Sequence, residues 1–394
     1  MRIVLINYAY DGAIGDPGEM LARHATTTGW AEAVAAAGAG AVVVAWRFSR
    51  DADLERGGVR YLFRRDADGP MAGARTEPRA LHQAVMASRP DLVHVNGLVF
   101  PSQVRQLRAA LPTTCPIVVQ DHAGVHPGPV AWWRARARWR RRAMRGGLQS
   151  ADAFLFTSIA QGRAWQDAGV IASSQTIHAV VESSTTMRAI DREDARRSSG
   201  VDGAPAILWV GRLNDNKDPL TVLDGFERAL ARLPDARLSM VFSEAPLIEP
   251  VRDRIRRSAA LSDRVRLCGR VEHDRLAAFY SAADLFVLGS HHEGSGYALI
   301  EAIACGCVPV VTSIPSFRAI TADGSVGALW ASGDGAGCAE ALARAAQVGL
   351  DAGRSAATAH FEERLSWTAI GRRAVDIYKE VGTARAGRDR ERSG

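Results

Sequence analysis

Apolar and polar residues alternate along the chain in blocks that favour parallel β-strands separated by helices. Short runs rich in valine, isoleucine and leucine are typical of strands buried on both faces of a sheet. In the first half these runs predict strands at residues 3–8, 41–48, 91–96, 117–122, 153–158 and 175–181. In the second half they predict strands at residues 206–210, 237–243, 264–268, 284–288 and 308–312. Because helix-like segments lie between the runs, we predict an α/β fold with parallel sheets covered by helices on both faces.

The length of the chain and its polar segments indicate two domains. A chain of 394 residues, 47% of them hydrophobic, is long for a single core and sufficient for two. A charge-rich span that contains Gly200 and Gly203 separates the two sets of strands. We predict a first domain at residues 1–183, a linker at 184–203, a second domain at 204–364, a C-terminal helix at 365–382 and a disordered tail at 383–394. Residues 50–78 have no clear period and are expected to be irregular.

A glycine-rich break precedes an apolar helical run in the second half. The break and the first helical turn consist of Gly294, Ser295, Gly296, Tyr297, Ala298 and Leu299. Small side chains let the backbone N–H groups of a first helical turn point at an anion, and the helix dipole adds to the attraction. Glu301 would lie about one turn further along, where a carboxylate can accept hydrogen bonds from the two hydroxyls of a ribose. The stretch therefore predicts a nucleotide site, with an ordinary glycine-rich turn as the alternative.

A second loop adds two cations. Residues 206–210 predict a buried strand, and Asp218 followed by Pro219 predicts a helix start, so Arg212 and Lys217 fall in the loop after the strand. Open α/β sheets bind ligands at this end of their strands. Of the 49 basic residues only Lys217 and Lys379 are lysines, which leaves 47 arginines. A lysine in this loop favours a compact point charge, as on a diphosphate, over a merely solvated loop cation.

Three short segments follow one another in the second half of the chain. They are Val-Gly-Arg-Leu at residues 210–213 followed by Lys217, the pair Glu293 and Glu301 with seven residues between them, and Ala-Cys-Gly-Cys-Val-Pro-Val-Val at residues 304–311. Their order and spacing resemble the nucleotide-sugar half of the retaining GT-B glycosyltransferases of the family-4 (glycosyl transferases group 1) type. The resemblance covers residues 200–380. That family commonly has an aromatic residue between the two glycines, where this chain has Ser295.

The resemblance implies a fold and a reaction. It implies the GT-B architecture, in which two Rossmann-like domains face each other across a cleft and a C-terminal helix crosses back to the first domain. It implies a retaining, metal-independent transfer of a hexose-type sugar from a nucleotide diphosphate sugar to an acceptor hydroxyl. The nucleotide sugar is a co-substrate and no separate cofactor is expected; UDP-sugars are favoured over GDP-sugars. The acceptor, whether a glycan, a lipid-linked molecule or a small molecule, is not indicated.

The charges of this reaction suggest roles for particular residues. Arg212, Lys217 and the amides near Gly294 would stabilise the leaving diphosphate, and Glu293 would hold hydroxyls of the sugar. In the resembled family a histidine at the position of His122 contacts the donor sugar, and the leaving phosphate oxygen helps deprotonate the acceptor. The family also implies a donor or acceptor contact for Gly15. A structural histidine and a plain turn glycine are the alternatives for these two.

Two other function classes are consistent with the same residues. A nucleotide-sugar epimerase shares the GT-B architecture and would convert a donor with no acceptor present. A non-catalytic nucleotide-sugar-binding relative would bind without turnover. A Rossmann dehydrogenase is disfavoured, because no strand is followed by the spaced glycine fingerprint with a downstream acid.

An arginine- and tryptophan-rich stretch begins at Trp132 and ends at Arg145. It holds seven arginines and three tryptophans in fourteen residues. Such a surface suits anionic lipid headgroups or a phosphorylated or carboxylated acceptor, and an amphipathic helix packed on the sheet is the alternative. Nucleic acid is not expected as a partner, because no recognised binding module accompanies the patch.

Cysteine usage and apolar runs indicate the compartment. The five cysteines are scattered and odd in number, which favours a reducing environment over a disulfide framework. Neither Cys305-Gly-Cys307 nor the Asp-Ala-Asp segments at residues 51–53 and 66–68 indicate metal ligands. No cleavage site follows the first strand and no apolar run reaches membrane-spanning length. We expect a cytoplasmic protein, with peripheral attachment to the inner face of the membrane as an alternative.

Overall fold

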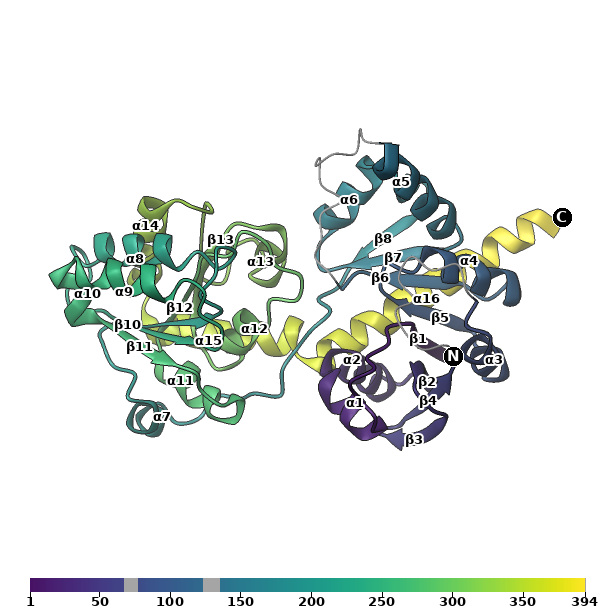
Figure 1. Ribbon diagram of the computed structural model, residues 1–394, viewed down its shortest axis with the longest axis horizontal. Helices are drawn as coiled ribbons and strands as arrows, with labels where there is room; N and C mark the ends of the chain where they lie inside the picture. Colours follow the sequence, from purple (N-terminus) through teal and green to yellow (C-terminus); the bar gives the residue numbers. More distant parts are fainter. Residues whose placement is uncertain (67–76, 123–134, 394) are drawn as a thin grey trace. The chain divides into compact units, whose positions relative to one another are not determined.

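The chain folds into two compact units (Figure 1). The computed structural model describes residues 1–66, 77–122 and 135–393, and only the backbone of residues 135–141 and 388–393. Unit 1 consists of Met1–Ser183 and Trp367–Gly394, and unit 2 consists of Ser184–Ser366. Unit 1 contains a mostly parallel β-sheet and unit 2 an all-parallel one, with helices between the strands, which confirms the predicted fold class.

Unit 1 contains an eight-stranded sheet. Its strands are β1 (Arg2–Asn7), β2 (Ala41–Phe48), β3 (Ala52–Arg56), β4 (Val59–Arg65), β5 (Leu92–Asn96), β6 (Ile117–Gln120), β7 (Ala153–Phe156) and β8 (Thr176–Ala179). The order across the sheet is β3-β4-β2-β1-β5-β6-β7-β8, and all neighbours are parallel except β3 and β4. The winding direction therefore reverses between β1 and β5, which is where doubly wound sheets open a ligand-binding crevice.

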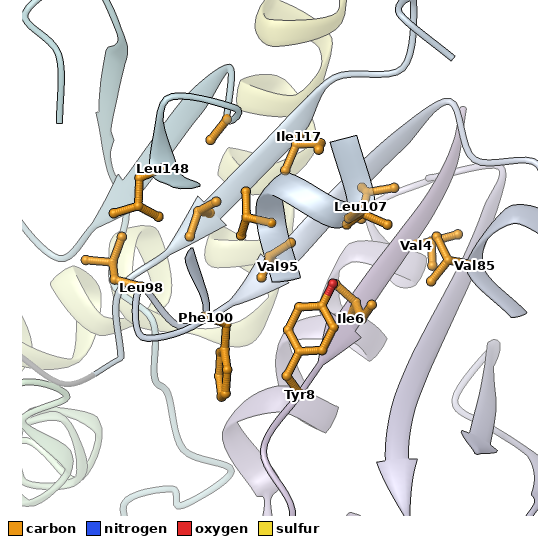
Figure 2. Close-up of a cluster of buried hydrophobic side chains, with 14 of the residues drawn as sticks. Val4, Ile6, Tyr8, Val85, Val95, Leu98, Phe100, Leu107, Ile117 and Leu148 are labelled. Carbon is orange, nitrogen blue, oxygen red and sulfur yellow. The ribbon is translucent and has the colours of Figure 1, made fainter. Parts of the chain in front are cut away.

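Helices cover both faces of this sheet. They are α1 (Pro17–Arg23), α2 (Ala25–Ala36), α3 (Arg79–Ala87), α4 (Pro101–Ala110), α5 (Ala135–Leu148), α6 (Ile159–Asp167) and α16 (Trp367–Ser393). Successive side chains of a strand point to opposite faces, so Val4 and Ile6 join the core that includes Leu107 of α4 (Figure 2). Ile3 and Leu5 join a second core that includes Ile377 of α16. Burial on both faces explains why these strands have continuous apolar sequences.

The segment predicted to be irregular contains a hairpin. β3 and β4 pair antiparallel across Gly57 and Gly58, whose φ angles of 57° and 74° suit a tight two-residue hairpin turn. In β4, Val59, Tyr61 and Phe63 are buried while Arg60 between them is exposed. The prediction for residues 50–78 was therefore wrong up to Arg65. Residues 67–76 lie outside the described part of the chain.

Unit 2 contains a six-stranded, all-parallel sheet. Its strands are β9 (Ala206–Gly211), β10 (Arg237–Phe242), β11 (Val265–Gly269), β12 (Leu285–Leu288), β13 (Val308–Thr312) and β14 (Ala328–Trp330). The order β11-β10-β9-β12-β13-β14 is that of a Rossmann fold, and its winding reverses between β9 and β12. β14 has only three residues, which is too short to give an apolar run that a sequence pattern can detect.

The helices of unit 2 include one that was predicted as linker. They are α7 (Arg192–Ser199), α8 (Pro219–Ala229), α9 (Ile248–Arg256), α10 (Ala259–Arg264), η1 (His273–Arg275), α11 (Leu276–Ala282), α12 (Tyr297–Ala304), α13 (Pro315–Ile320), α14 (Gly335–Gln347), α15 (Leu350–His360) and η2 (Phe361–Leu365). Residues 184–203 are not an extended connector, because α7 lies within them and packs on α11. Arg192 and Arg196 of this helix contact the buried carboxylate of Asp284, which fixes the segment to unit 2.

The C-terminal helix is longer than predicted. α16 begins at Trp367 and continues to Ser393, through the residues expected to form a disordered tail. Its last part contains alanines and arginines, which are strong helix formers. The Arg385 guanidinium also donates to the Thr113 carbonyl and to Asp152, at 2.7 Å each. These contacts attach the end of the helix to unit 1.

Candidate functional site

Two loops of unit 2 meet where its sheet changes winding direction. One follows β9 and contains Arg212 and Lys217; the other follows β12 and contains Glu293. β9 and β12 are adjacent and parallel, with Ile207 opposite Leu285, so the loops leave the same edge of the sheet from neighbouring strands. This edge is where ligands bind in open α/β sheets.

Asn216 holds the two loops against each other. Its side-chain amide donates to the His292 carbonyl and its side-chain oxygen accepts from the His292 N–H, both at 3.0 Å. Its own carbonyl accepts from the His291 N–H at 2.8 Å. The His291 ring contacts the Asp218 carboxylate at 3.2 Å. Sequence analysis missed Asn216, because an asparagine in a polar loop gives no sign of a partner in another loop.

Lys217 and Glu293 contact each other across these loops. The Lys217 ammonium donates to Glu293 Oε1, and the Ser290 hydroxyl donates to the same oxygen at 3.2 Å. Both charged side chains are largely buried, with exposed fractions of 13% and 15%. Burial, followed by the nearby charge of Arg212, lowers the pKa of Lys217 to about 8. The Glu293 carboxylate acts in the opposite direction, because it stabilises the charged amine.

Arg212 provides the second cation and is more exposed. About half of its side chain is accessible, and its nearest acid is Glu244, with 3.8 Å between Nη1 and Oε2. An exposed pair at this distance contributes little to stability. The guanidinium can therefore turn toward an anion in the crevice at small cost.

Helix α12 begins beside these cations. Its N-cap is Gly296 with φ of 64°, a left-handed conformation, and no side chain caps its first turn among the described residues. The φ angle of Gly296 favours glycine, and a Cβ there would also lie 2.7 Å from Ile320 Cδ1, so that this side chain would have to shift. The segment Gly294, Ser295, Gly296 thus leads into Tyr297 and Ala298 with their backbone at the start of a helix, as predicted. The Leu299 N–H donates to the Gly296 carbonyl at 3.0 Å.

Glu301 lies further along α12 and is buried. Its Oε2 accepts from the Tyr280 hydroxyl at 3.0 Å, and its Oε1 lies 3.1 Å from Nε2 of His273, whose side chain is exposed. Burial and the Glu301 charge raise the pKa of Tyr280, so this hydroxyl keeps its proton and stays a donor. Sequence analysis missed Tyr280 and His273, which come from α11 and η1. The predicted role requires a carboxylate oxygen that can accept from a ribose hydroxyl. Oε1 can do so once the exposed His273 ring moves away.

The remaining predicted residues belong to unit 1. His122 follows β6, and its ring contacts Glu182 through Nδ1 at 2.6 Å and Asn96 through Nε2 at 3.1 Å. Gly15 lies in the loop between β1 and α1, where a Cβ would have no neighbour within 4 Å. Neither Glu182 nor Asn96 was predicted from the sequence, because only the strand order of the sheet brings them close to His122.

The arginine- and tryptophan-rich stretch is described only in part. Trp132 and Trp133 lie outside the described residues, as do the side chains up to residue 141. Helix α5 begins at Ala135 within this stretch, and Arg142 and Arg145 on it are exposed. Contact with an anionic membrane or acceptor stays a prediction. No helix in the described part of the chain combines the length and the apolar character needed to span a bilayer.

Two family models match the chain, one in each unit. A model described as Glycosyltransferase Family 4 matches residues 25–182, and a model described as Glycosyl transferases group 1 matches residues 204–347. The second match contains Arg212, Lys217, Glu293 and Glu301. The first contains His122.

Curated relatives match over part or most of the chain. A GDP-mannose:cellobiosyl-diphosphopolyprenol alpha-mannosyltransferase of Xanthomonas campestris is 29% identical over 75% of this chain and 76% of the relative. D-inositol 3-phosphate glycosyltransferase 2 of Catenulispora acidiphila is 33% identical over 51% of this chain and 49% of the relative. The chain thus spans about half the length of this second relative.

Solved structures share the fold over nearly the whole chain. A sucrose-phosphate synthase from Thermosynechococcus elongatus superposes with a TM-score of 0.64 at 21% identity, over 97% of this chain and 99% of that one. An Anabaena protein in complex with UDP and glucose superposes with a TM-score of 0.64 at 16% identity, over 96% of this chain and 100% of that one. Together with the two matching family models, these likenesses identify the chain as a member of the family-4, glycosyl transferases group 1 type of glycosyltransferases, with the GT-B fold.

Proposed function

We propose that this protein is a retaining glycosyltransferase that moves a hexose-type sugar from a nucleotide diphosphate sugar to an acceptor hydroxyl. The observation that carries the proposal is the contact between Lys217 and Glu293 at the β9–β12 reversal, directly before the start of α12, whose N-cap is Gly296. This arrangement combines a buried cation, a carboxylate and helix N–H groups at one edge of a sheet. A sugar diphosphate needs these three kinds of group.

The cations and the helix start act on the leaving group. Departure of the nucleoside diphosphate increases negative charge on its phosphate oxygens, while the sugar ring becomes positive. Lys217, Arg212 and the amides near Gly294 to Tyr297 stabilise the first charge. These fixed positive groups take the part that a metal ion plays in other phosphate chemistry, and the proposed reaction is therefore metal-independent.

The two glutamates bind the two sugars of the donor. Glu293 holds hydroxyls of the transferred sugar, once the diphosphate has taken over Lys217. Glu301 accepts the hydroxyls of the ribose. The Tyr280 hydroxyl fixes Glu301 at Oε2, so Oε1 is the oxygen that receives the ribose when the exposed His273 ring moves away. Departure of an exposed side chain costs little.

Retention follows from the proposed chemistry of the leaving group. The leaving phosphate oxygen removes the proton of the acceptor hydroxyl on the same face of the sugar, so the new bond has the configuration of the old one. His122 and Gly15 of unit 1 contribute to the sugar or acceptor side. We expect UDP-sugars to be the preferred donors, because a protein of similar fold binds UDP. GDP-mannose is the second candidate, because the Xanthomonas relative is named for it.

The test compares two lysine variants. Lys217→Ala should lower kcat/KM for sugar transfer or donor hydrolysis by a factor of about 10²–10³, the usual loss for one group that stabilises a developing anion. Lys379→Ala removes the other lysine of the chain, which lies on α16, and should leave the rate unchanged. UDP-sugars and GDP-mannose are supplied with inositol phosphate, sugar phosphate and polyprenol-linked acceptors. The anomeric configuration of the product is read by NMR.

Other outcomes would contradict the proposal. Turnover of Lys217→Ala or Glu301→Gln at the wild-type rate would remove these residues from the site. A new nucleotide sugar formed from donor alone would indicate an epimerase. Nucleotide-sugar binding without release of a nucleoside diphosphate, with every donor and acceptor, would indicate a binding protein.

A further inference from the structure

A buried carboxylate lies behind His122 and has no part in the function proposed above. The Glu182 side chain is 2% exposed, and its Oε2 lies 2.6 Å from His122 Nδ1. His122 itself is more accessible, with 28% of its side chain exposed. A buried acid therefore contacts one nitrogen of a ring that is itself partly accessible.

The His122–Glu182 pair is part of a series of contacts between four segments of unit 1. His122 Nε2 lies 3.1 Å from Asn96 Oδ1, and the Asn96 amide donates to the Thr27 hydroxyl at 3.4 Å. Thr27 is on α2, Asn96 ends β5, His122 follows β6 and Glu182 follows β8. Because the two nitrogens have neighbours on different segments of the chain, the plane of the imidazole ring is fixed from two sides.

The burial of Glu182 has an energetic implication. Removing a carboxylate from water costs several kcal/mol unless hydrogen bonds and a counter-charge offset the cost. A neutral side chain could fill the same space at lower cost. Another pair in unit 1 shows the contrast: His178 Nδ1 lies 3.6 Å from Glu380, which is 54% exposed. In that pair the acid is exposed and the contact is long, whereas the Glu182 contact is short and its acid is shielded from solvent.

We propose that Glu182 is a positioning residue that acts on the donor or acceptor through His122. Its carboxylate accepts from Nδ1, while Nε2 donates to Asn96 Oδ1 in the ligand-free protein. On binding, the oxygen of a sugar hydroxyl replaces Asn96 Oδ1 as the acceptor from Nε2. The proposal rests on the function proposed above, in which His122 contacts the sugar or the acceptor.

The first experiment needs no substrate. The full-length protein is labelled with ¹⁵N and the imidazole resonances are recorded, with His122→Asn used to assign the His122 signals. We expect a solvent-protected Nδ1–H for His122 in the wild type, and its loss or a large upfield shift in Glu182→Gln. Glu380→Gln, which alters the surface pair, should leave the His122 signals unchanged. An unprotected Nδ1 in the wild type, or identical spectra for wild type and Glu182→Gln, would overturn the proposal.

The second experiment separates positioning from a structural role. Glu182→Gln should lower kcat for transfer by about tenfold or more, the worth of one hydrogen bond to a charged group. The dissociation constant for the nucleoside diphosphate, which binds through unit 2, should stay within about twofold. In a His122→Ala background the same change should have no further effect on kcat. Equal losses in both backgrounds would mean that Glu182 only supports the fold, and this would overturn the proposal.

The two proposals fail in different ways. If His122→Ala transfers sugar at the wild-type rate, glycosyl transfer stands while the role of Glu182 through His122 is refuted. If Lys217→Ala also retains full activity, the proposed donor site itself is wrong. Melting temperatures of all variants are measured alongside, and Glu182→Asp serves as a second variant should Glu182→Gln fail to fold.

Discussion

Lys217 is the residue on which the proposed donor site most depends. It is largely buried, it lies near a second cation, and it contacts one carboxylate. Burial and Arg212 lower its pKa to about 8, whereas a guanidinium at the same place would keep its charge at any ordinary pH. Lysine at this position therefore makes the charge of the site sensitive to pH.

Binding of a nucleoside diphosphate should weaken as the pH rises above about 8. Below this pH the amine of the ligand-free protein is charged and ready for the diphosphate. Above it the amine is neutral, so binding must recover a proton, and the dissociation constant should rise by up to about tenfold per pH unit. The phosphates of UDP contribute no change in this range, because their last pKa is about 6. Isothermal titration calorimetry with UDP between pH 7 and 10 measures the effect.

Two variants test the assignment to Lys217. Lys217→Arg should flatten the pH dependence, since the guanidinium stays charged. Glu293→Gln should move the onset of weakening to lower pH, because the carboxylate that stabilises the ammonium is gone. Parallel curves for wild type and Lys217→Arg would show that another group controls the pH dependence.

The sequence predicts those residues of the candidate site that follow a motif, and it does not predict the residues that contact them. Arg212, Lys217 and Glu293 stand at recognisable spacings after apolar runs. Asn216 bonds to His292, 76 residues away, and Tyr280 and His273 reach Glu301 from other helices. These partners are set by strand order and helix packing. A single sequence contains no local sign of them.

At the scale of elements, α16 depends on close packing against α2. A Cβ at Gly371 would clash with the carbonyl of Ala33 on α2, and Gly29 of α2 faces the Trp367 ring in the same way. Tyr378 of α16 also accepts from Trp30 at 3.0 Å and contacts His94 at 2.6 Å. Backbone proximity and a buried hydrogen-bonded tyrosine together fix the helix on unit 1.

Two glycine-to-alanine changes in α16 should change the free energy of unfolding in opposite directions. Gly371→Ala should destabilise unit 1 by about 1–3 kcal/mol, because the methyl group forces the two helices apart. Gly382→Ala should stabilise it by about 0.5–1 kcal/mol, since alanine is the better helix former and a Cβ there meets nothing within 4 Å. Urea unfolding followed by circular dichroism measures both. Equal effects of the two changes would mean that α16 does not pack on α2 as described.

The elements that could be predicted are those with a buried, continuous pattern. The inner strands of both sheets were placed from their apolar runs. The β3–β4 hairpin was missed because its outer strand is almost entirely exposed, although Gly57 and Gly58 were a usable turn signal. α7 was missed because only Ala195 of its residues is buried. Its arginines Arg192 and Arg196 pair with Asp284, which is distant in the sequence. Both β3 and α7 are held by contacts with residues outside the element, which the local sequence pattern does not show.

At the scale of the molecule, the two units differ in how the chain builds them. Unit 2 is one continuous segment, Ser184–Ser366, whereas unit 1 combines Met1–Ser183 with the segment that starts at Trp367. Ile370, Ile377 and Tyr378 of that segment belong to the core around Ile3 and Leu5. Unit 1 is therefore complete only when the last helix has docked, while unit 2 contains all of its own core.

We expect two thermal transitions that respond to different changes. UDP binds through unit 2 in the proposed function, so at a hundred times its dissociation constant it should stabilise that unit by about 2.7 kcal/mol and raise only one transition. Gly371→Ala should lower only the other transition, and removal of residues 367–394 should abolish it. Differential scanning calorimetry with and without UDP distinguishes the two. A single transition that both UDP and Gly371→Ala shift would show that the units unfold as one cooperative body, and the independence inferred from their separate cores would then be wrong.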